Sequence, residues 1–430
     1  MYEWSLSINW VVMIGRTWEE FENIIEGLAE WADTDNDTRL IIYVHNLSYE
    51  FQFMRKHLNI EKVFALKERK VAQVITNEGI EFRCSYILSG YSLANLSNQL
   101  VKYKVSKKVG DLDYKLPRTP LTPLTEKELG YCINDVIVVT AYIQEIIERD
   151  GNITKIPLTK TGYVRNHCRN ACLYGDKTHR KNTDKYHKYR KLMKSLTLEV
   201  EEYCMLKQAF MGGFTHASAP FSRGTFHNVG SFDETSAYPA VMLSEKFPMS
   251  KGKQLKIETE EQFKNCLINY CCLFEVIFEF IEEDFGYEHY IPVSKCQKLY
   301  SQKDENGEEW NVVEDNGRVV KAGYIRMTIT EQDYFIIRRF YKWKVLKVGK
   351  FIAYEKEYLP TEFVKSILDL YIKKTELKDV KGKEVEYMQS KERVNSAYGM
   401  CVTDILRDEI TYSLDEWGKE TPDIEEAISI

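Results

Sequence analysis

The sequence predicts a chain of two or three domains that joins an α/β domain to an α+β domain. Its 430 residues exceed the number that one hydrophobic core usually holds. Strand-like and helical runs alternate through residues 1–150, whereas β-rich stretches dominate residues 245–355. A hydrophobic fraction of 44% and a charged fraction of 29% are typical of globular proteins.

The α/β prediction for residues 1–150 starts from their strands. The run Leu40–Val44 is short, apolar and rich in β-formers, and a helical pattern follows it at 49–58. Further strands are predicted at 71–75 and 80–87, with a turn at Asn77-Glu78-Gly79 between them. This alternation favours a three-layer α/β domain.

Helices are predicted by local signals along the whole chain. The sequence at 125–128, Thr-Glu-Lys-Glu, has the layout of a capping box and opens a helix that should reach about Glu148. Helical periodicity returns at 197–208, 361–374 and 384–398. The last two stretches predict an antiparallel pair of helices joined by a short polar loop.

The middle of the chain is expected to be β-rich with a surface hairpin or loop. Residues 271–281 read as a strand. Residues 303–318 contain Asn306-Gly307 and Asn316-Gly317, two dipeptides that favour tight turns.

The cysteines and the N-terminus bear on the cellular compartment. Cys271 and Cys272 are adjacent, Cys168 and Cys172 are four residues apart, and the ten cysteines contain no repeated C-x-x-C pair. We expect reduced thiols, no signal peptide and no apolar run long enough to cross a bilayer. These features predict a cytoplasmic protein without a membrane partner.

Charge is unevenly distributed although the net charge is −6. Residues 155–194 carry 12 Lys or Arg against two Asp, interleaved with tyrosines. Such a stretch is typical of a strand-binding groove or linker, and a solvated basic loop is equally consistent with it.

Two motifs carry the strongest chemical signal. Residues 233–239 read Asp-Glu-Thr-Ser-Ala-Tyr-Pro, and residues 391–399 read Lys-Glu-Arg-Val-Asn-Ser-Ala-Tyr-Gly. In the second, Lys391, Asn395 and Tyr398 lie at helical spacings, so their side chains share one face. Phe232 reads as the end of a strand, which would put Asp233 at a strand end. A carboxylate there can bind divalent cations and a lysine can neutralise a phosphate, which favours phosphoryl transfer. The alternatives are a helix-capping aspartate and a solvated helical lysine.

Three weaker motifs precede this pair. They read Asn46-Leu47-Ser48-Tyr49-Glu50, Ser92-Leu93-Ala94-Asn95-Leu96 and Tyr131-Cys132-Ile133-Asn134-Asp135. In the third, the tyrosine and the aspartate are one helical turn apart, so both can face one metal-bound water. Each motif alone is also compatible with an ordinary turn or helix face.

The order of these motifs resembles that of the protein-primed B-family DNA polymerases of bacteriophages. The early motifs resemble the second and third proofreading exonuclease motifs with a single-strand contact motif between them, and the later pair resembles nucleotide-handling motifs A and B. Gly212-Gly213 resembles the Gly-Gly element of that family. The resemblance implies an RNase H-like 3′→5′ exonuclease domain, followed by a B-family palm and fingers with a terminal-protein-region insertion.

The resemblance also implies domain boundaries. They are an exonuclease-like domain at 1–150, a basic linker at 151–200, the start of the palm with motif A at 201–244, an insertion with palm strands at 245–355, fingers with motif B at 356–400, and a truncated palm continuation at 401–430.

Roles for individual residues follow from the same resemblance. Asp233 would bind Mg²⁺ or Mn²⁺ in the polymerase site, while Glu50 and Asp135 would bind metal in the exonuclease site with Tyr131 as a further catalytic residue. The expected nucleotide-binding residues are Tyr238, which would exclude a 2′-hydroxyl, with Ser236, Lys373, Lys391, Asn395 and Tyr398. The expected DNA-binding residues are Asn46, Ser92, Leu93, Lys108, Gly212 and Gly213. The implied partners are a DNA template and primer strand, dNTPs and a terminal protein, in the host cytoplasm.

Several positions depart from the family pattern. Glu50 stands where Asp is usual, Phe210 where Tyr is typical, and Lys108 lies beside the place of the catalytic lysine. No D-x-E precedes Asn46 and no Y-x-D-T-D follows Gly399. We therefore expect a fragment of a longer polymerase, with half of a split enzyme, an inactive nucleic-acid-binding remnant and a stand-alone exonuclease as alternatives.

Overall fold

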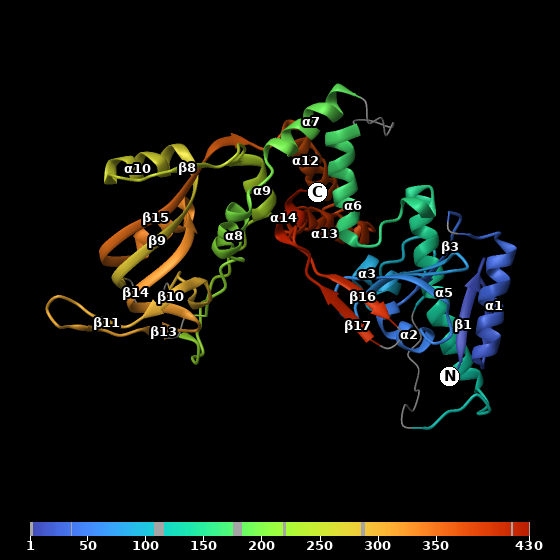
Figure 1. The fold of residues 1–430 in the computed structure, drawn as a ribbon. Coiled ribbons are helices and arrows are strands. Elements are labelled where there is room, and N and C mark those ends of the chain that lie inside the picture. The colour runs from blue at the N-terminus through green and yellow to red at the C-terminus, as the bar shows by residue number, and fades with distance from the viewer. Residues whose placement is uncertain are drawn as a thin grey trace. The chain divides into compact units, whose positions relative to one another are not determined.

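The backbone of the computed structural model is described for residues 3–35, 37–106, 116–174, 183–217, 221–284, 289–413 and 416–429. It divides into two compact units (Figure 1). The first unit comprises Met1–Ala171 and Lys365–Asp423, and the second comprises Cys172–Val364 and Ile424–Ile430. The chain thus combines helices and sheets, as the sequence predicts.

The first unit contains a four-stranded sheet in the order β3-β6-β5-β4, in which β3 and β6 are parallel and the other pairs antiparallel. Its strands and those of two small hairpins are β1 (Trp4–Ile8), β2 (Val11–Gly15), β3 (Leu40–Val44), β4 (Ile60–Ala65), β5 (Val71–Thr76), β6 (Ile80–Cys84), β16 (Glu409–Ser413) and β17 (Glu416–Glu420). Its helices are α1 (Trp18–Trp31), α2 (Leu47–Met54), α3 (Ser85–Ser89), α4 (Leu93–Ser97), α5 (Glu126–Asp150), η1 (Ile153–Lys155), α6 (Lys160–Arg169) and α13 (Glu384–Cys401), together with most of α12 (Thr361–Glu376).

Apolar side chains from α1, α2 and the sheet form one core of this unit. Ile25 of α1 and Phe51 of α2 pack with Val74 and Phe82 of the sheet, and all four are buried. At about 25 cal/mol per Å² of buried apolar surface, each such side chain contributes roughly 1.5–3 kcal/mol. Val44 at the end of β3 packs against this core, and the motif Asn46–Glu50 begins two residues later.

Local sequence signals explain most helix ends here. Thr17 with Glu20 and Thr125 with Glu128 form capping boxes at the starts of α1 and α5, the second as predicted. Gly79 turns the chain between β5 and β6 with φ +82°, and a Cβ there would lie 2.6 Å from the backbone oxygen of Asp35. Only glycine fits that turn without strain.

Helix α5 meets the length and composition of a membrane-spanning helix, the one such helix in the described ranges. Its Val139, Ile143 and Ile146 pack instead in a core cluster with Leu88 and Ile156. The carboxylate of its Glu145 accepts hydrogen bonds from the backbone amides of residues 101–103. These contacts join α5 to the rest of the first unit.

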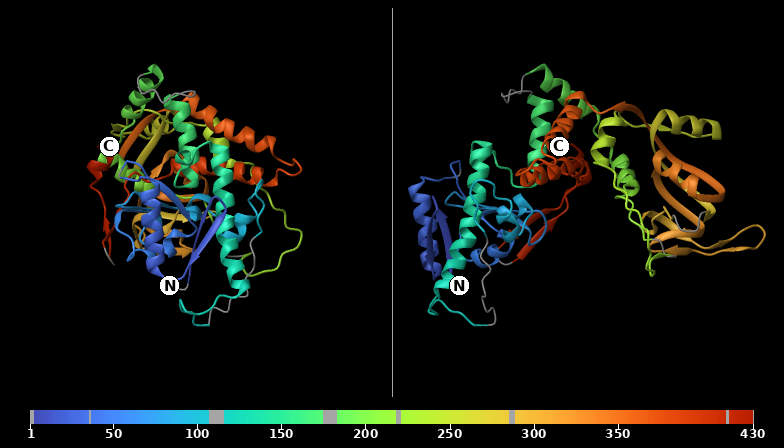
Figure 2. Two further views of the ribbon diagram at one scale, coloured as in Figure 1. Left: turned by 90° about the vertical axis from the view of Figure 1, so that its right-hand side faces the viewer. Right: turned by 180° about the vertical axis from the view of Figure 1, so that it is seen from behind.

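The second unit is built on a seven-stranded antiparallel sheet with the central order β10-β14-β9-β15-β7. Figure 2 shows the ribbon from two further sides. Its strands are β7 (Lys246–Pro248), β8 (Lys253–Leu255), β9 (Tyr270–Glu283), β10 (Cys296–Tyr300), β13 (Val313–Asp315), β14 (Arg318–Thr330) and β15 (Tyr341–Tyr358), with β11 (Gln302–Lys303) and β12 (Glu309–Trp310) in a separate hairpin. Its helices are α7 (Asp184–Ser195), α8 (Val200–Ala209), α9 (Ala237–Ser244), α10 (Glu260–Asn269), η4 (Val293–Lys295), α11 (Glu331–Phe340) and α14 (Ile424–Ser429), and η2 (Asn170–Tyr174) leads into this unit.

Alternation along β9 divides the residues of this sheet between two cores. Phe274 and Phe278 pack on the face covered by α10 and α11, where they meet Phe263 and Ile337. Leu273 points to the other face and packs against α8. Successive side chains of a strand point to opposite faces, so one strand supplies both cores.

Two sequence predictions are clarified by the structure, and the second of them is wrong. The first concerns residues 151–200, whose role as a basic linker stays a prediction; the segment contains α6 and α7, which Thr159 and Thr183 cap by accepting hydrogen bonds from backbone amides. No strand precedes Asp233: residues 221–234 lack strand hydrogen bonding, and Phe232 is 98% exposed. A strand needs a hydrogen-bonded neighbour, and none of the described strands pairs with this segment.

Candidate functional site

The motif Asn46–Glu50 follows the carboxyl end of β3. Asn46 has φ 59° and ψ 48°, a left-handed conformation that asparagine tolerates better than most residues, and it turns the chain into α2. Leu47 and Phe51 of α2 are buried in the core, so Glu50 is held beside the sheet. Asn46 itself is exposed.

Carboxylates gather around this point. Burial raises the pKa of Glu50, and the negative charge of Glu3 raises it further. The pKa of the Cys132 thiol is raised to about 12, first by burial and then by Glu3, with Asp135 adding to the effect. Glu3 therefore lies within electrostatic range of both Glu50 and the motif on α5.

Sequence reasoning missed Glu3. The signal that could have found it is a carboxylate directly before the strand-like run Trp4–Ile8, next to which α5 packs. Within the described ranges, no group of three or more His, Cys, Asp or Glu side chains has a metal-binding arrangement. Glu50, Tyr131 and Asp135 are half-buried, and their catalytic roles stay predictions.

The Ser92 motif has structural contacts of its own. The Ser92 hydroxyl caps α4 by accepting a hydrogen bond from the Asn95 amide at 3.4 Å. Leu93 packs into the cluster that contains Val139 and Ile143 of α5. Contacts of Ser92 and Leu93 with DNA stay predictions, and Lys108 lies outside the described residues.

In the second unit, the glycine pair and motif A approach each other. A Cβ on Gly213 would lie 3.0 Å from the Tyr238 hydroxyl, whereas a Cβ on Gly212 would have no atom within 4 Å. Ser236 adopts a left-handed conformation with φ 55° just before α9, and Asp233 is exposed in the preceding loop. Gly213 and Tyr238 are thus neighbours, although 25 residues separate them in the sequence.

Motif B lies on α13, as its spacing predicts. Lys391 and Asn395 are exposed and Tyr398 is half-buried, while Val394 and Ala397 form the fully buried face of the helix. Lys391 and Asn395 therefore point away from the packed side of the helix, and Tyr398 lies at its border. Lys373 is exposed on α12, which is joined to α13 by a short turn, as predicted.

A charged cluster anchors α13 within the first unit. The carboxylate of Glu392 accepts hydrogen bonds from the Tyr91 hydroxyl and, at 2.6 Å, from the Lys160 ammonium group. Burial, followed by the hydrogen bond to Glu392, raises the pKa of Tyr91. The residue beside Lys391 is thus fixed by contacts to α6 and to the segment that carries the Ser92 motif.

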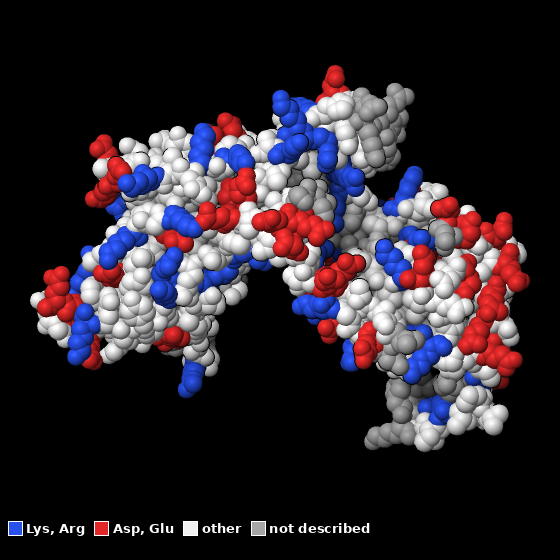
Figure 3. All heavy atoms as spheres, viewed as in Figure 1, with Lys and Arg blue, Asp and Glu red and all other residues white. Residues whose placement is uncertain are grey.

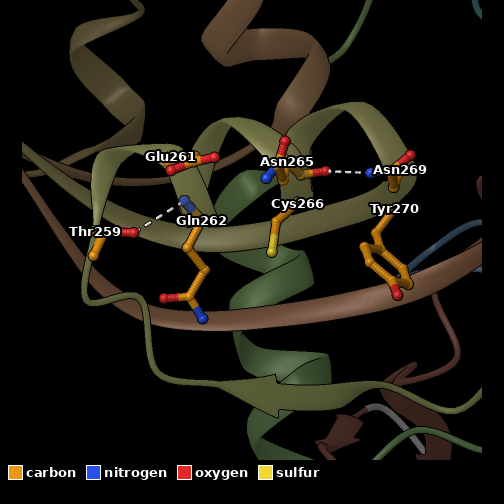
Figure 4. Close-up of a pocket in the computed structure, with 7 residues that line it drawn as sticks. All are labelled: Thr259, Glu261, Gln262, Asn265, Cys266, Asn269 and Tyr270. Carbon is orange, nitrogen blue, oxygen red and sulfur yellow. Dashed lines mark hydrogen bonds between the residues drawn. The ribbon is translucent and has the colours of Figure 1, made fainter.

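Basic side chains gather over α7 (Figure 3), in the stretch that the sequence marks as basic and aromatic. A hollow of about 340 Å³ runs along α10 (Figure 4), lined by short polar side chains such as Thr259 and Asn265. Thr259 caps α10, and Asn265 accepts a bond through its backbone oxygen from Asn269 at 2.9 Å. None of the residues that sequence reasoning selected lines this hollow.

Comparison with known proteins gives one family. The family model described as DNA polymerase type B, organellar and viral, matches residues 102–428. No curated protein sequence matches the chain significantly.

Three solved structures share the fold. Phi29 DNA polymerase with primer-template DNA, in the post-translocation binary complex, has a TM-score of 0.68 at 15% identity over 96% of this chain and 66% of that one. The ternary complex of the same polymerase with primer-template DNA and incoming nucleotide substrates has a TM-score of 0.67 at 15% identity. That match covers 96% of this chain and 67% of that one. The complex with single-stranded DNA has a TM-score of 0.65 at 16% identity, and the match covers 96% of this chain and 66% of that one. The chain therefore spans about two thirds of the length of these polymerases.

Proposed function

Because the chain belongs to the family of organellar and viral type B DNA polymerases, we propose that it carries out template-directed DNA synthesis of the protein-primed bacteriophage kind. One observation carries the proposal: in a member of this family, Lys391, Asn395 and Tyr398 lie along the outward side of α13. A lysine there can neutralise the charge of a nucleotide triphosphate.

The remaining polymerase roles are assigned as follows. Tyr238 would lie under the sugar of the incoming nucleotide, with its hydroxyl next to Gly213, and Ser236 would contact the nucleotide. Lys373 would supply a second positive charge from α12. Asp233, exposed before α9, supplies a carboxylate toward a divalent cation.

Divalent metal ions are general cofactors of type B polymerases, and carboxylate oxygens suit Mg²⁺ or Mn²⁺. In this chain Asp233 would hold the ion of the polymerase site, and Glu50 and Asp135 that of an exonuclease site. The gathering of Glu3 and Glu50 supports the second assignment, because mutual repulsion of carboxylates is relieved by a cation. Such an ion would neutralise charge on the reacting phosphate.

The proposed architecture is an RNase H-like exonuclease domain followed by palm and fingers. The mixed sheet of the first unit, with its parallel β3–β6 pair, supports the exonuclease assignment. The α12–α13 pair would form the fingers, and the sheet of the second unit would contain the terminal-protein-region insertion. The proposed partners are template and primer DNA, dNTPs and a terminal protein. The proposed compartment is the host cytoplasm, and the fact that all ten cysteines are free supports it.

Primer extension by the purified chain with Mg²⁺ tests the proposal. We expect extension that Asp233→Ala abolishes and that Glu245→Ala, which removes an exposed carboxylate at the end of α9, leaves unchanged. Extension that survives Asp233→Ala would refute the assignment of the polymerase site. Digestion of single strands that is lost in Asp135→Ala would add exonuclease activity.

A second candidate is nucleic-acid binding without catalysis. The observation that favours it is the loop around Asp233, which is exposed and pairs with none of the described strands. This function predicts that labelled primer-template binds equally to the wild type and to Asp233→Ala, without extension in either case. Metal-dependent extension by the wild type would exclude it.

A further inference from the structure

The segment that carries the glycine pair lies beside Tyr238. Residues 210–217, here named the glycine segment, follow α8 directly and form neither helix nor strand. Gly212 and Gly213 lie in its middle, and neither has a left-handed φ, so backbone conformation does not require glycine at either position. A side chain at 213 would instead come within 3.0 Å of the Tyr238 hydroxyl. The position of the glycine segment therefore determines the space beside Tyr238.

The start of the glycine segment is attached to the sheet of the second unit. Gln208, near the end of α8, accepts hydrogen bonds through its side-chain oxygen from Gln297 of β10 at 2.8 Å and from the Thr328 hydroxyl of β14 at 2.9 Å. Thr328 is fully buried, which fixes this contact to the body of the sheet. Three residues after Gln208, Met211 packs against the apolar core of the same unit. The chain thus enters the glycine pair from a fixed point.

Arg318, the first residue of β14, attaches the part of the segment that follows the glycine pair. Its guanidinium group donates hydrogen bonds to the backbone oxygens of Thr215 at 3.4 Å and of Tyr290 at 2.6 Å. The same group lies over the ring of Phe214, 4.6 Å from the ring centroid. A planar guanidinium group can make both kinds of contact at once, which an ammonium group cannot. Arg318 therefore joins the two residues after Gly213 to the sheet.

The base on which Phe214 rests is itself fixed. The Phe214 ring stacks on Tyr290 with a centroid distance of 6.1 Å and an angle of 24° between the rings. The Tyr290 hydroxyl donates a hydrogen bond at 2.6 Å to Asp333, a buried carboxylate at the start of α11. Phe214 is 49% exposed, so burial alone holds its ring only in part, and the contacts with Tyr290 and Arg318 add the rest.

We propose that Arg318 is a positioning residue for the nucleotide site. By holding Phe214 and Thr215, it keeps the preceding Gly213 beside the Tyr238 hydroxyl. It acts through the glycine segment rather than by contact with the nucleotide. The inference rests on the proposed function, in which Tyr238 lies under the sugar and excludes a 2′-hydroxyl. Arg318 would thus contribute to the preference for deoxyribonucleotides, because a displaced Tyr238 discriminates less well between the two sugars.

Fluorine NMR of the full chain, with 3-fluorotyrosine incorporated only at Tyr238, tests the positioning without any nucleotide. Arg318→Gln should shift or broaden the Tyr238 resonance, because the glycine segment is released at its far end. Arg326→Gln is the matched control: Arg326 lies on the same strand and pairs with Glu275 at 2.9 Å, so its loss should leave the resonance unchanged. An unchanged resonance in Arg318→Gln would overturn the proposal, as would equal changes in both variants.

Two further variants keep this test decisive if Arg318→Gln folds poorly. Arg318→Lys keeps the positive charge without the planar fork and should change the Tyr238 resonance in the same direction by a smaller amount. Phe214→Ala removes the ring that Arg318 holds and should change the resonance as Arg318→Gln does. Because both changes release one segment, the double variant Phe214→Ala/Arg318→Lys should show no more than the effect of Phe214→Ala. Additive effects would show that Arg318 does not act through Phe214.

Nucleotide titration supplies a readout that a purely structural role would not change. The ratio of the affinities for a fluorescent dNTP and its ribonucleotide counterpart should fall about threefold in Arg318→Gln, recover in part in Arg318→Lys, and stay at the wild-type value in Arg326→Gln. Equal loss of both affinities, with the ratio unchanged, would overturn the role in sugar selection.

The two measurements also separate this inference from the proposed function. Failure of the wild type to bind any nucleotide would refute the proposed function, while the fluorine spectrum still reports whether Arg318 positions Tyr238. A changed Tyr238 resonance in Arg318→Gln then supports the positioning, and an unchanged one overturns it.

Discussion

Glu392 should stabilise the first unit more than any other carboxylate on α13, and Glu392→Gln tests this directly. The carboxylate lies 2.6 Å from the Lys160 ammonium group, and the two side chains are 28% and 29% exposed. The same carboxylate also accepts a hydrogen bond from the Tyr91 hydroxyl. A fully exposed ion pair contributes about 0–1 kcal/mol and a shielded charged hydrogen bond about 1.5–3 kcal/mol.

Because the side chains of Glu392 and Lys160 are partly exposed, the loss of stability in Glu392→Gln should lie between these two ranges. We expect Glu392→Gln to lower the free energy of unfolding by about 1–2 kcal/mol, measured by urea titration of tryptophan fluorescence. Glu386→Gln is the matched control on the same helix, because Glu386 pairs with Lys383 at 2.7 Å in a more exposed i,i+3 contact. Its loss should be about 0.2–0.5 kcal/mol.

A double-mutant cycle sharpens the same test. Glu392→Gln and Lys160→Gln should show a coupling free energy of about 0.5–1 kcal/mol if the two side chains interact as described. Equal effects of Glu392→Gln and Glu386→Gln, together with zero coupling, would refute the reasoning.

Further predictions concern the glycine pair and the start of α5. Gly213→Ala should weaken nucleotide binding at least threefold, because its Cβ would lie 3.0 Å from the Tyr238 hydroxyl. Gly212→Ala is the control, because its Cβ would meet no atom within 4 Å and should change nucleotide affinity little. Titration with a fluorescent nucleotide measures both affinities, and equal effects would contradict the contact between Gly213 and Tyr238. Glu128 has its pKa lowered from 4.5 to about 2, first by the hydrogen bond from the Thr125 backbone amide. Its contribution to stability is therefore present above pH 4.5 and is lost as the pH falls toward about 2. In thermal melts the difference between wild type and Glu128→Gln should shrink over that range, and a constant difference would show that the capping box does not act through this charge.

Local signals predicted much of the fold. Leu40–Val44 forms β3 as expected, and the capping box at Thr125 begins α5. The two helices predicted at 361–374 and 384–398 are α12 and α13, each extended by two or three residues. In each of these cases neighbouring residues determine the element through periodicity or capping, so the sequence contains the whole signal.

Contacts between residues far apart in the sequence could not be predicted from local signals. The ion pair between Lys160 and Glu392 joins residues 232 positions apart, and no local pattern indicates it. The approach of Glu3 to Glu50 likewise depends on how β1 and α2 lie in the folded unit. The predicted strand before Asp233 failed for a related reason, because a strand forms only beside a pairing neighbour.

The candidate site likewise has features that local sequence predicts and features that depend on tertiary packing. The helical spacing of Lys391, Asn395 and Tyr398 could be read from the sequence, whereas the contact of their neighbour Glu392 with Lys160 required α13 to pack beside α6. Arg393 lies within motif B, yet the ring that it contacts is that of Tyr163, which comes from a distant segment.

The most direct test of the central claim is the affinity of the chain for an Mg²⁺–dNTP complex. Lys391→Gln removes the proposed triphosphate contact, and Lys381→Gln removes an exposed charge from the turn between α12 and α13. The account predicts that Lys391→Gln weakens binding at least tenfold, or about 1.4 kcal/mol, while Lys381→Gln stays within twofold of the wild type. Equal affinity of Lys391→Gln and the wild type would contradict the claim that α13 presents a nucleotide-binding face.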